Sequence, residues 1–154
     1  GIDLEEPQNE CLIQFAQESG LPLMLAPGPR LASIRDQITR LMRLHPVLHL
    51  NEAEALTMSG QSDPEQAVMA LSAQGAEKVI ITLGERGSMG YDGKKIFAHP
   101  ANRVRIVNTG GAGDAHAGAC LHAWNQRMPM DEILKMADHT AARALCCAGA
   151  LRQE

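Results

Sequence analysis

The 154-residue sequence has few aromatic residues, and its cysteines show no spacing typical of a disulfide framework. Aromatic side chains make up 3% of the chain, whereas eight residues are methionine. This composition predicts a core of flexible aliphatic side chains and by itself gives no signal of a cofactor. The four cysteines include no CxxC pair, which favours a reducing compartment over a disulfide-stabilised secreted domain.

Long apolar runs and clusters of basic residues are also missing. No apolar run approaches the roughly 20 residues that a membrane-spanning helix needs. The N-terminal stretch GIDLEEPQNE is acidic, unlike a signal peptide. The formal net charge is −4, and no Lys/Arg cluster could neutralise a line of phosphates, although a small anion needs only local donors. We therefore predict a cytoplasmic protein with neither nucleic acid nor membrane as a partner.

Helical and extended segments alternate along the chain, which predicts an α/β fold with a parallel sheet flanked by helices. We expect helices at residues 5–20, 32–44, 51–58, 63–75 and 130–150, another starting within 107–119 and running to about Arg127, strands at 21–25, 46–50, 78–84 and 103–108, and a hairpin within 88–100. In the first helix, Cys11, Leu12, Phe15 and Ala16 lie at helical spacing. No repeat or linker interrupts residues 1–154, so we expect a single domain.

Local signals mark several ends of these elements. Asp63 is a suitable N-cap with Pro64 at the first helical position, and Asp92-Gly93 is typical of a hairpin turn. Asn51, Gly84 and Asn108 each follow the end of an expected strand. Ligands of α/β proteins bind at the carboxyl ends of parallel strands, so these positions are candidates for a binding site.

The stretch VNTGGAGDAHAGA, residues 107–119, places four glycines and four alanines around Asp114. A strand that turns through small residues into a helix leaves backbone N–H groups free to approach an anion. A dinucleotide fingerprint would need glycine where His116 stands, and a P-loop would need a lysine that the stretch lacks. Asp114 is then either a general base beside a transferring phosphoryl group or a first-turn acid favoured by the helix dipole.

Three motifs together resemble those of the ribokinase-like carbohydrate kinases. VNTGGAGDA is similar to the family signature Asp-Thr-x-Gly-Ala-Gly-Asp, NEAE matches Asn-x-x-Glu, and VIITLGERG is similar to Thr-x-Gly-x-x-Gly. The motifs stand in the family's order, and GLPLMLAPGPR looks like the strand and loop that precede Asn-x-x-Glu. The resemblance covers almost the whole chain and implies a three-layer ribokinase-like fold, ATP and Mg²⁺ as cofactors, and a sugar or nucleoside as the phosphoryl acceptor.

The resemblance also implies roles for individual residues. Asp114 matches the catalytic base, and the N–H groups of Gly111, Ala112 and Gly113 match the anion hole. Asn51 and Glu54 match the pair that organises Mg²⁺. The alternative interpretation of Glu54 is an ordinary solvated acid on a helix. The residues implied beside the nucleotide are Thr82, Gly84, Glu85, Gly87, Asn108 and Thr109. An ordinary strand-end turn is the alternative for Thr82, Gly84 and Gly87.

Two departures from the family pattern qualify this transfer of roles. Asn108 replaces the usual first Asp of the signature, which puts potassium activation in doubt, and pseudouridine kinases resemble this chain in carrying Asn there. Family members are about twice this long, so we expect residues 1–154 to be a C-terminal, ATP-binding portion without the N-terminal half, its lid, or a short C-terminal tail. Such a portion would tend to self-associate because apolar surface is left uncovered.

We therefore weigh three functions. The leading one is ATP-dependent phosphoryl transfer to a sugar or nucleoside hydroxyl, and its rival is a truncated or degenerate module that binds nucleotide without catalysis. A redox dinucleotide-binding domain is the third, and the residue at His116 counts against it. The remaining histidines are expected to be structural, because His116 and His122 are six residues apart and the others are scattered singly.

Overall fold

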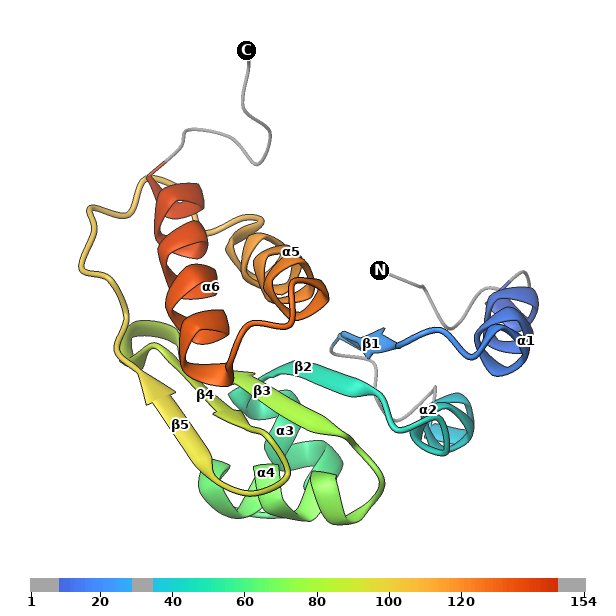
Figure 1. Ribbon diagram of the computed structural model, residues 1–154. Helices are drawn as coiled ribbons and strands as arrows, with labels where there is room; N and C mark the ends of the chain where they lie inside the picture. The colour runs from blue at the N-terminus through green and yellow to red at the C-terminus, as the bar shows by residue number, and fades with distance from the viewer. Residues whose placement is uncertain (1–8, 29–34, 147–154) are drawn as a thin grey trace. The chain divides into compact units, whose positions relative to one another are not determined.

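The computed structural model describes residues 9–28 and 35–146 of the chain (Figure 1). The elements in chain order are α1 (Asn9–Ser19), β1 (Met24–Leu25), α2 (Arg35–Met42), β2 (Val47–Asn51), α3 (Glu52–Ser59), α4 (Pro64–Ala73), β3 (Lys78–Thr82), the 3-10 turn η1 (Gly84–Arg86), β4 (Ser88–Tyr91), β5 (Ile96–His99), α5 (Ala112–Asn125) and α6 (Met130–Leu145). Predicted helical residues at 5–8, 32–34 and 147–150 lie outside the described residues.

The strands follow the order β1-β2-β3-β4-β5 in one sheet. β1 and β2 pair in parallel, with Met24 opposite Val47 and Leu25 opposite Leu48. The fold is therefore mixed α/β, with a mostly parallel sheet flanked by helices, as the sequence predicts. No helix of the described residues has the length and apolarity that a membrane crossing requires.

The contacts divide the chain into two compact units. Unit 1 comprises residues 1–81 and 91–95, and unit 2 comprises residues 82–90 and 96–154. Unit 1 thus contains α1 to α4 and nearly all of β1 to β3, whereas unit 2 contains η1, β5, α5, α6 and most of β4. The expectation of a single domain over 1–154 stays a prediction.

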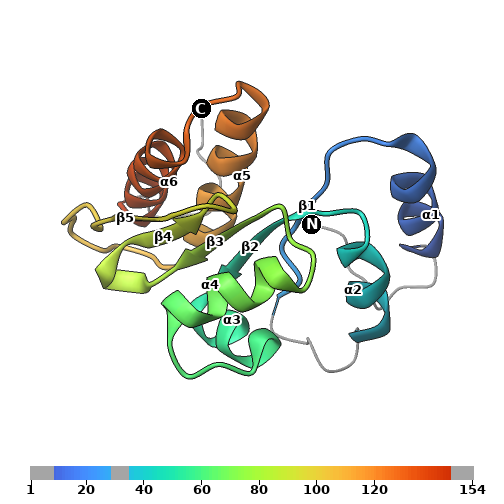
Figure 2. The same cartoon turned by 60° about the horizontal axis from the view of Figure 1, so that its bottom comes forward.

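Unit 1 is built on the two strongly apolar strands β2 and β3, with α3 packed against α4 and against β2 (Figure 2). Four of the five residues of β2 are buried, because the continuous apolar run VLHL is suited to a strand covered on both faces. Burying one large aliphatic side chain contributes about 1.5–3 kcal/mol. The fully buried side chains of unit 1 include Leu41, Val47, Leu48, Leu50, Val68, Leu71, Val79, Ile80 and Ile81.

The N-terminus of α4 is capped as the sequence predicts. The Asp63 carboxylate accepts hydrogen bonds from the N–H groups of Glu65 (2.9 Å) and Gln66 (3.1 Å), with Pro64 at the first helical position. Such a cap stabilises a helix by about 1 kcal/mol.

The apolar face predicted for α1 is wrong, because Ile13 is buried whereas Phe15 is 59% exposed. Local spacing alone could not choose between these two adjacent apolar faces.

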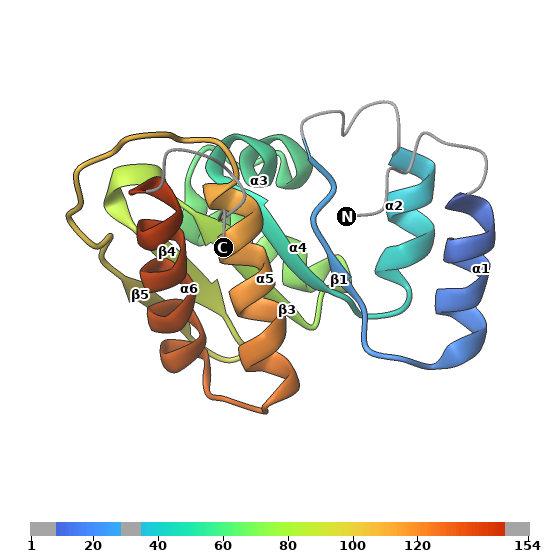
Figure 3. The same cartoon turned by 90° about the horizontal axis from the view of Figure 1, so that it is seen from above.

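Unit 2 is dominated by the pair α5 and α6, which lie side by side along their length (Figure 3). Their buried faces carry small and aliphatic residues, which lets the two backbones approach. On α6 these residues, together with the buried Asp138, recur at spacings of three and four, as an amphipathic helix requires. They are Met130, Ile133, Leu134, Ala137 and Ala142, with Ala123 and Cys120 on α5.

The predicted hairpin is present as β4 and β5, and its turn starts at Asp92 as expected. The Asp92 carboxylate accepts from the N–H groups of Lys94 and Lys95, both at 2.9 Å, and Gly93 has a φ of +89°. The N–H group of Lys95 is the main cause that lowers the pKa of Asp92. The turn at Asp92-Gly93 is therefore stabilised by hydrogen bonds within residues 92–95.

The strand predicted at 103–108 is wrong, because these residues form an irregular loop. The N–H groups of Val107 and Asn108 both donate to Leu145 O, at 2.8 and 3.2 Å. The last carbonyls of a helix lack intrahelical donors, so the loop supplies them at the end of α6. The β-branched run that suggested a strand leaves Ile106 and Val107 51% and 57% exposed.

Candidate functional site

The glycine-rich stretch forms an open helix N-terminus in unit 2. Gly111 is the N-cap of α5 with φ +80°, a left-handed conformation that favours glycine. The first helical hydrogen bond joins Ala115 N to Gly111 O at 2.9 Å, so the preceding N–H groups of α5 have no acceptor within the helix. A Cβ added at Gly113 would meet no atom within 4 Å. This end of α5 can therefore be approached closely by an anion.

Asp114 is the third residue of α5 and is exposed. Within residues 9–28 and 35–146, its carboxylate has no hydrogen-bond partner. A third-position acid often bonds back to the N-cap N–H group, and Asp114 does not. Its oxygens are thus available to accept a proton from a molecule that approaches the same helix end.

Asn108 and Gly110 shape the approach to this helix end. Asn108 Oδ1 accepts a hydrogen bond from Gly110 N–H at 2.9 Å, a tight local turn that asparagine makes readily. The backbone N–H of Asn108 is held by Leu145 O. Thr109, between them, is exposed. The side chain of Asn108 therefore has a structural role in the loop that enters α5.

The segment TLGERG forms a second compact turn of unit 2. Leu83 N–H donates to Gly87 O at 2.8 Å and Gly87 N–H donates to Gly84 O at 3.1 Å, which closes the 3-10 turn η1. Gly87 has φ +96°, and a Cβ there would lie 2.0 Å from His99 O. Hairpin geometry by itself therefore requires glycine at 87. Glu85 and Gly84 are exposed at the tip, whereas Thr82 is half-buried.

Asn51 and Glu54 lie in unit 1 and hydrogen-bond to each other at the start of α3. Asn51 Oδ1 accepts from Glu54 N–H at 2.9 Å, and Glu54 Oε2 accepts from Asn51 N–H at 3.0 Å. This reciprocal arrangement is a capping box. It uses one oxygen of each side chain and leaves Glu54 Oε1 outside the cap. An oxygen of this kind is the ligand that Mg²⁺ prefers.

The structure therefore groups the predicted residues in two sets. Asn51 and Glu54 belong to unit 1, and every other predicted site residue belongs to unit 2. Each unit also has a hollow, and neither of these two hollows is lined by a predicted site residue. One, in unit 2, is lined by Arg103, Arg143 and His139 beside the apolar Val104 and Ala142. The other, in unit 1, lies at the end of α2 and contains none of the predicted residues.

The sequence analysis missed a buried polar cluster in unit 2. Asp138 on α6 is 6% exposed, and its carboxylate contacts Ser88, His99 and His116. A signal was present, because Asp138 follows Leu134 by four residues and precedes Ala142 by four, on the apolar face of α6. The three partners are 22 to 50 residues away in sequence, so the pattern could not name them.

Known proteins are similar to this chain in sequence. The family described as pfkB family carbohydrate kinase matches residues 3–153. The chain is 33% identical over 113 residues to a cytidine kinase of Thermococcus kodakarensis, covering 72% of this chain and 41% of that protein. It is 31% identical over 144 residues to a mouse (Mus musculus) ribokinase, covering 89% and 44%. The chain thus spans less than half the length of these curated relatives.

Solved structures agree with this assignment. An aminoimidazole riboside kinase of Salmonella enterica, complexed with its riboside and an ATP analogue, superposes with a TM-score of 0.77 at 25% identity, covering 95% of this chain and 52% of that one. A proposed ribokinase II of Escherichia coli, in complex with ATP and Mg²⁺, gives a TM-score of 0.82 at 23% identity, covering 92% and 47%. The chain is therefore a member of the pfkB family of carbohydrate kinases.

Proposed function

We propose that this chain carries the ATP-binding and catalytic-base portion of a kinase that phosphorylates a hydroxyl of a sugar or nucleoside. The observation that carries the proposal is the N-terminus of α5. It combines N–H groups that have no acceptor within the helix with an exposed carboxylate, Asp114, that has no hydrogen-bond partner among the described residues. A carboxylate beside an anion cradle weakens plain anion binding and suits proton abstraction during phosphoryl transfer.

In this proposal Asp114 removes the proton from the acceptor hydroxyl. The hydroxyl oxygen forms a bond to the γ-phosphorus as the bond between that phosphorus and the ADP oxygen breaks. The N–H groups of Gly111, Ala112 and Gly113 stabilise the charge on the phosphoryl oxygens. The helix dipole of α5 adds to this stabilisation because partial positive charge accumulates at the helix N-terminus.

Glu54 and Asn51 are the residues that would hold Mg²⁺. The capping box fits this role because it fixes the Glu54 carboxylate at a helix start while leaving Oε1 to bind the ion or one of its waters. Mg²⁺ usually keeps several waters and takes one or two protein carboxylates, which suits a single acid. When bound, the ion would neutralise charge on the phosphates of ATP.

The nucleotide would lie against the backbone of the second unit. We assign Thr82, Gly84, Glu85, Gly87, Asn108 and Thr109 to its surroundings, following their match to the family motifs. The E. coli neighbour was solved with ATP and Mg²⁺, which supports these two ligands here. The groove of unit 2 that is lined by Arg103, Arg143 and His139 places two guanidinium groups beside apolar surface, a combination that suits a nucleotide.

The relatives act on sugars and on nucleosides, and the acceptor of this chain is proposed to belong to the same classes. The second candidate function is nucleotide binding without catalysis. The observation that favours it is length, since the chain covers 41% and 44% of the curated relatives. We further propose a cytoplasmic location, where ATP is the available donor.

Two measurements on the 154-residue chain separate these functions. Calorimetric titration with Mg·ATP tests binding, and a coupled ADP-release assay over pentoses, hexoses and nucleosides tests transfer. Binding together with acceptor-dependent ADP release supports the kinase. Binding without release, the result that we expect for these residues alone, supports the binding module for the isolated chain, and Asp114→Asn in an active form of the protein then tests the catalytic base. If Mg·ATP does not bind at millimolar concentration, both proposals fail for this chain.

A further inference from the structure

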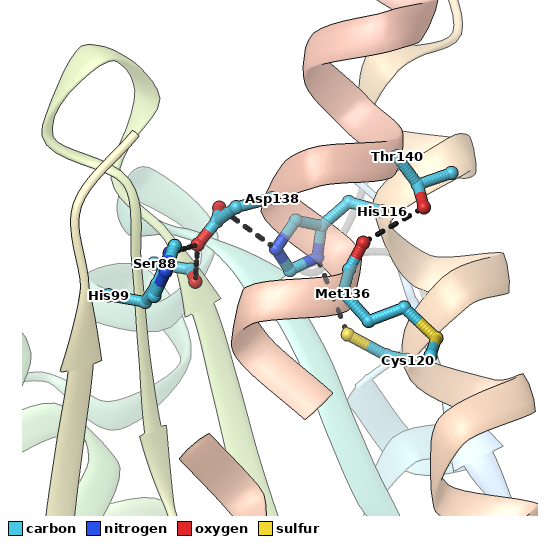
Figure 4. Close-up of polar contacts among 7 residues, drawn as sticks. All are labelled: Ser88, His99, His116, Cys120, Met136, Asp138 and Thr140. Carbon is cyan, nitrogen blue, oxygen red and sulfur yellow. Dashed lines mark hydrogen bonds and ion pairs between the residues drawn. The ribbon is translucent and has the colours of Figure 1, made fainter. Parts of the chain in front are cut away.

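A single buried carboxylate joins four elements of unit 2. Asp138 lies in the middle of α6, and its side chain faces β4, β5 and α5 (Figure 4). Ser88 at the start of β4 is 1% exposed, and His116 on α5 is 2% exposed. We call Ser88, His99, His116 and Asp138 the Asp138 cluster. Burying a carboxylate costs free energy unless hydrogen-bond donors surround it, so these contacts are what allow Asp138 to be buried.

The two oxygens of Asp138 have different partners. Ser88 Oγ donates to Oδ2 at 2.7 Å, and His99 Nδ1 lies 2.9 Å from the same oxygen. His116 Nε2 lies 3.4 Å from Oδ1. Oδ2 is therefore held by the β4–β5 hairpin, whereas Oδ1 faces α5.

Cys120 contacts the side of the His116 ring that faces away from Asp138. Its Sγ lies 3.5 Å from His116 Nδ1, one turn along α5. Burial, assisted by the charge of Asp138, raises the pKa of this thiol to about 12, so the thiol keeps its proton at neutral pH. The neutral thiol can donate a hydrogen bond to His116 Nδ1.

The sequence of α5 makes this anchor important. Residues 112–119 are alanine, glycine, Asp114 and His116, so the first two turns carry few side-chain atoms that could fix the helix by packing. His116 is the first fully buried side chain of α5. The position and rotation of the helix start therefore depend on what holds His116.

The other end of the cluster adjoins the second turn of the candidate site. Ser88 directly follows Gly87, the last residue of TLGERG, and His99 is the residue whose carbonyl packs against Gly87. Asp138 thus contacts the residue next to one glycine turn and, through His116, the helix start that contains the other. The two segments have no covalent link shorter than residues 88–110.

We propose that Asp138 is a positioning residue that holds the Gly84–Gly87 turn and the N-terminal turns of α5 in fixed relation, through Ser88 and His99 on one side and His116 on the other. Asp138 does not touch the reacting groups in this role. The proposal deepens the proposed function and rests on it for its effect on nucleotide binding. The mechanical link between the two segments can be tested without any ligand.

The experiment compares Asp138→Asn with Ile133→Val, a matched control that removes one buried methyl group from the same helix without touching the cluster. Hydrogen exchange by mass spectrometry is measured over residues 84–90 and 111–118, and Mg·ATP binding is measured by calorimetry. We expect Asp138→Asn to speed exchange in both segments together and to weaken Mg·ATP binding about tenfold. Ile133→Val should lower the melting temperature while leaving both readouts within twofold of the parent chain.

The outcomes separate the two proposals. If the parent chain does not bind Mg·ATP, the proposed function fails while the exchange data still decide the role of Asp138. If Asp138→Asn matches Ile133→Val in both readouts, the positioning role is overturned. Should Asp138→Asn not fold, Ser88→Ala removes one donor from the hairpin side, and faster exchange at 111–118 is then the result that supports the link. Unchanged exchange there overturns it.

Discussion

The Glu54 carboxylate accepts a hydrogen bond from Asn51 N–H at 3.0 Å, while the Asn51 amide oxygen accepts one from Glu54 N–H at 2.9 Å. Both residues proposed to organise Mg²⁺ therefore also cap a helix. Glu54 and Asp114 are each the third residue of their helices, but Asp114 has no such bond among the described residues. Glu54 thus makes a capping hydrogen bond and Asp114 does not, so substitutions can separate a capping role from a chemical role.

Glu54→Gln should raise the Mg²⁺ concentration needed for half-maximal activity while leaving stability nearly unchanged. The glutamine oxygen can still accept from Asn51 N–H, whereas the charge that attracts the ion is lost. Glu54→Ala should additionally lower the free energy of unfolding by about 1 kcal/mol, because the reciprocal cap is gone. Activity against Mg²⁺ concentration and urea unfolding measure the two effects. Glu65→Gln, in the first turn of α4, is the control, and an unchanged magnesium dependence in Glu54→Gln would return Glu54 to a purely capping role.

Asp114→Asn should lower the turnover number by roughly 10²- to 10⁴-fold in an active form of the protein, because the proton acceptor is removed. Nucleotide affinity should stay the same or rise, since a negative charge beside the phosphates has gone. Steady-state kinetics and calorimetry with Mg·ATP give the two numbers. Asp131→Asn, an exposed acid in the first turn of α6, serves as the control. Near-normal turnover of Asp114→Asn would exclude it as the base.

Gly113→Ala should stabilise the chain slightly yet weaken nucleotide binding. A Cβ at this position meets no protein atom within 4 Å, and alanine is favoured over glycine in a helix by about 1 kcal/mol. The added methyl group would occupy the space in which phosphate oxygens approach the N–H groups. Gly118→Ala is a matched control in the same helix, also with no atom within 4 Å. Equal nucleotide affinity for both variants would contradict the anion hole.

Alkaline pH should destabilise the chain through Cys120. The pKa of this thiol is about 12 in the folded chain, above the ordinary value of 9.0 that applies when it is unfolded. Between these two values the unfolded chain releases the proton and the folded chain keeps it, so stability falls as pH rises from about 9 toward 12. Urea unfolding of the parent chain and of Cys120→Ala should show a shallower pH dependence in the variant.

The same burial should protect Cys120 from thiol reagents. Iodoacetamide at pH 8 should modify the exposed Cys11 and Cys146 within minutes, and Cys120 only after denaturant is added. Peptide mapping by mass spectrometry distinguishes the sites. Modification of Cys120 at the rate of Cys146 in the folded chain would be inconsistent with a buried, protonated thiol.

The isolated chain should associate and show negligible transfer to common pentoses, hexoses and nucleosides. Large apolar side chains are exposed in both units, including Phe15 (59%) and Leu21 (61%) in unit 1 and Val107 (57%) and Leu121 (48%) in unit 2. Such surface favours association. Light scattering beside the ADP-release assay tests both points. Brisk acceptor-dependent turnover by a monomer would show that these residues suffice for catalysis.

Motifs and caps could be predicted from the sequence because each depends on residues close together in the chain. Asp63 caps α4 through bonds to residues two and three positions away, and the turn at Asp92 closes on residues 94 and 95. The α/β class and the family follow from alternating elements and from motifs in order. The start of a helix within residues 107–119 was predicted for the same reason, since a turn through small residues into a helix is a local signal.

Tertiary structure decided the features whose partners lie far apart. Residues 103–108 have the composition of a strand, but the backbone at 107 and 108 instead supplies donors to the end of α6. Packing decided which face of α1 is buried, since Ile13 is buried and Phe15 is exposed. Asp138 is an acid at a position where the pattern of α6 predicts an apolar residue. The tertiary structure explains it, because Ser88, His99 and His116 surround its carboxylate. Hydrophobic periodicity records which face of a helix is buried, whereas the partner of a buried charge depends on contacts between elements that no local pattern contains.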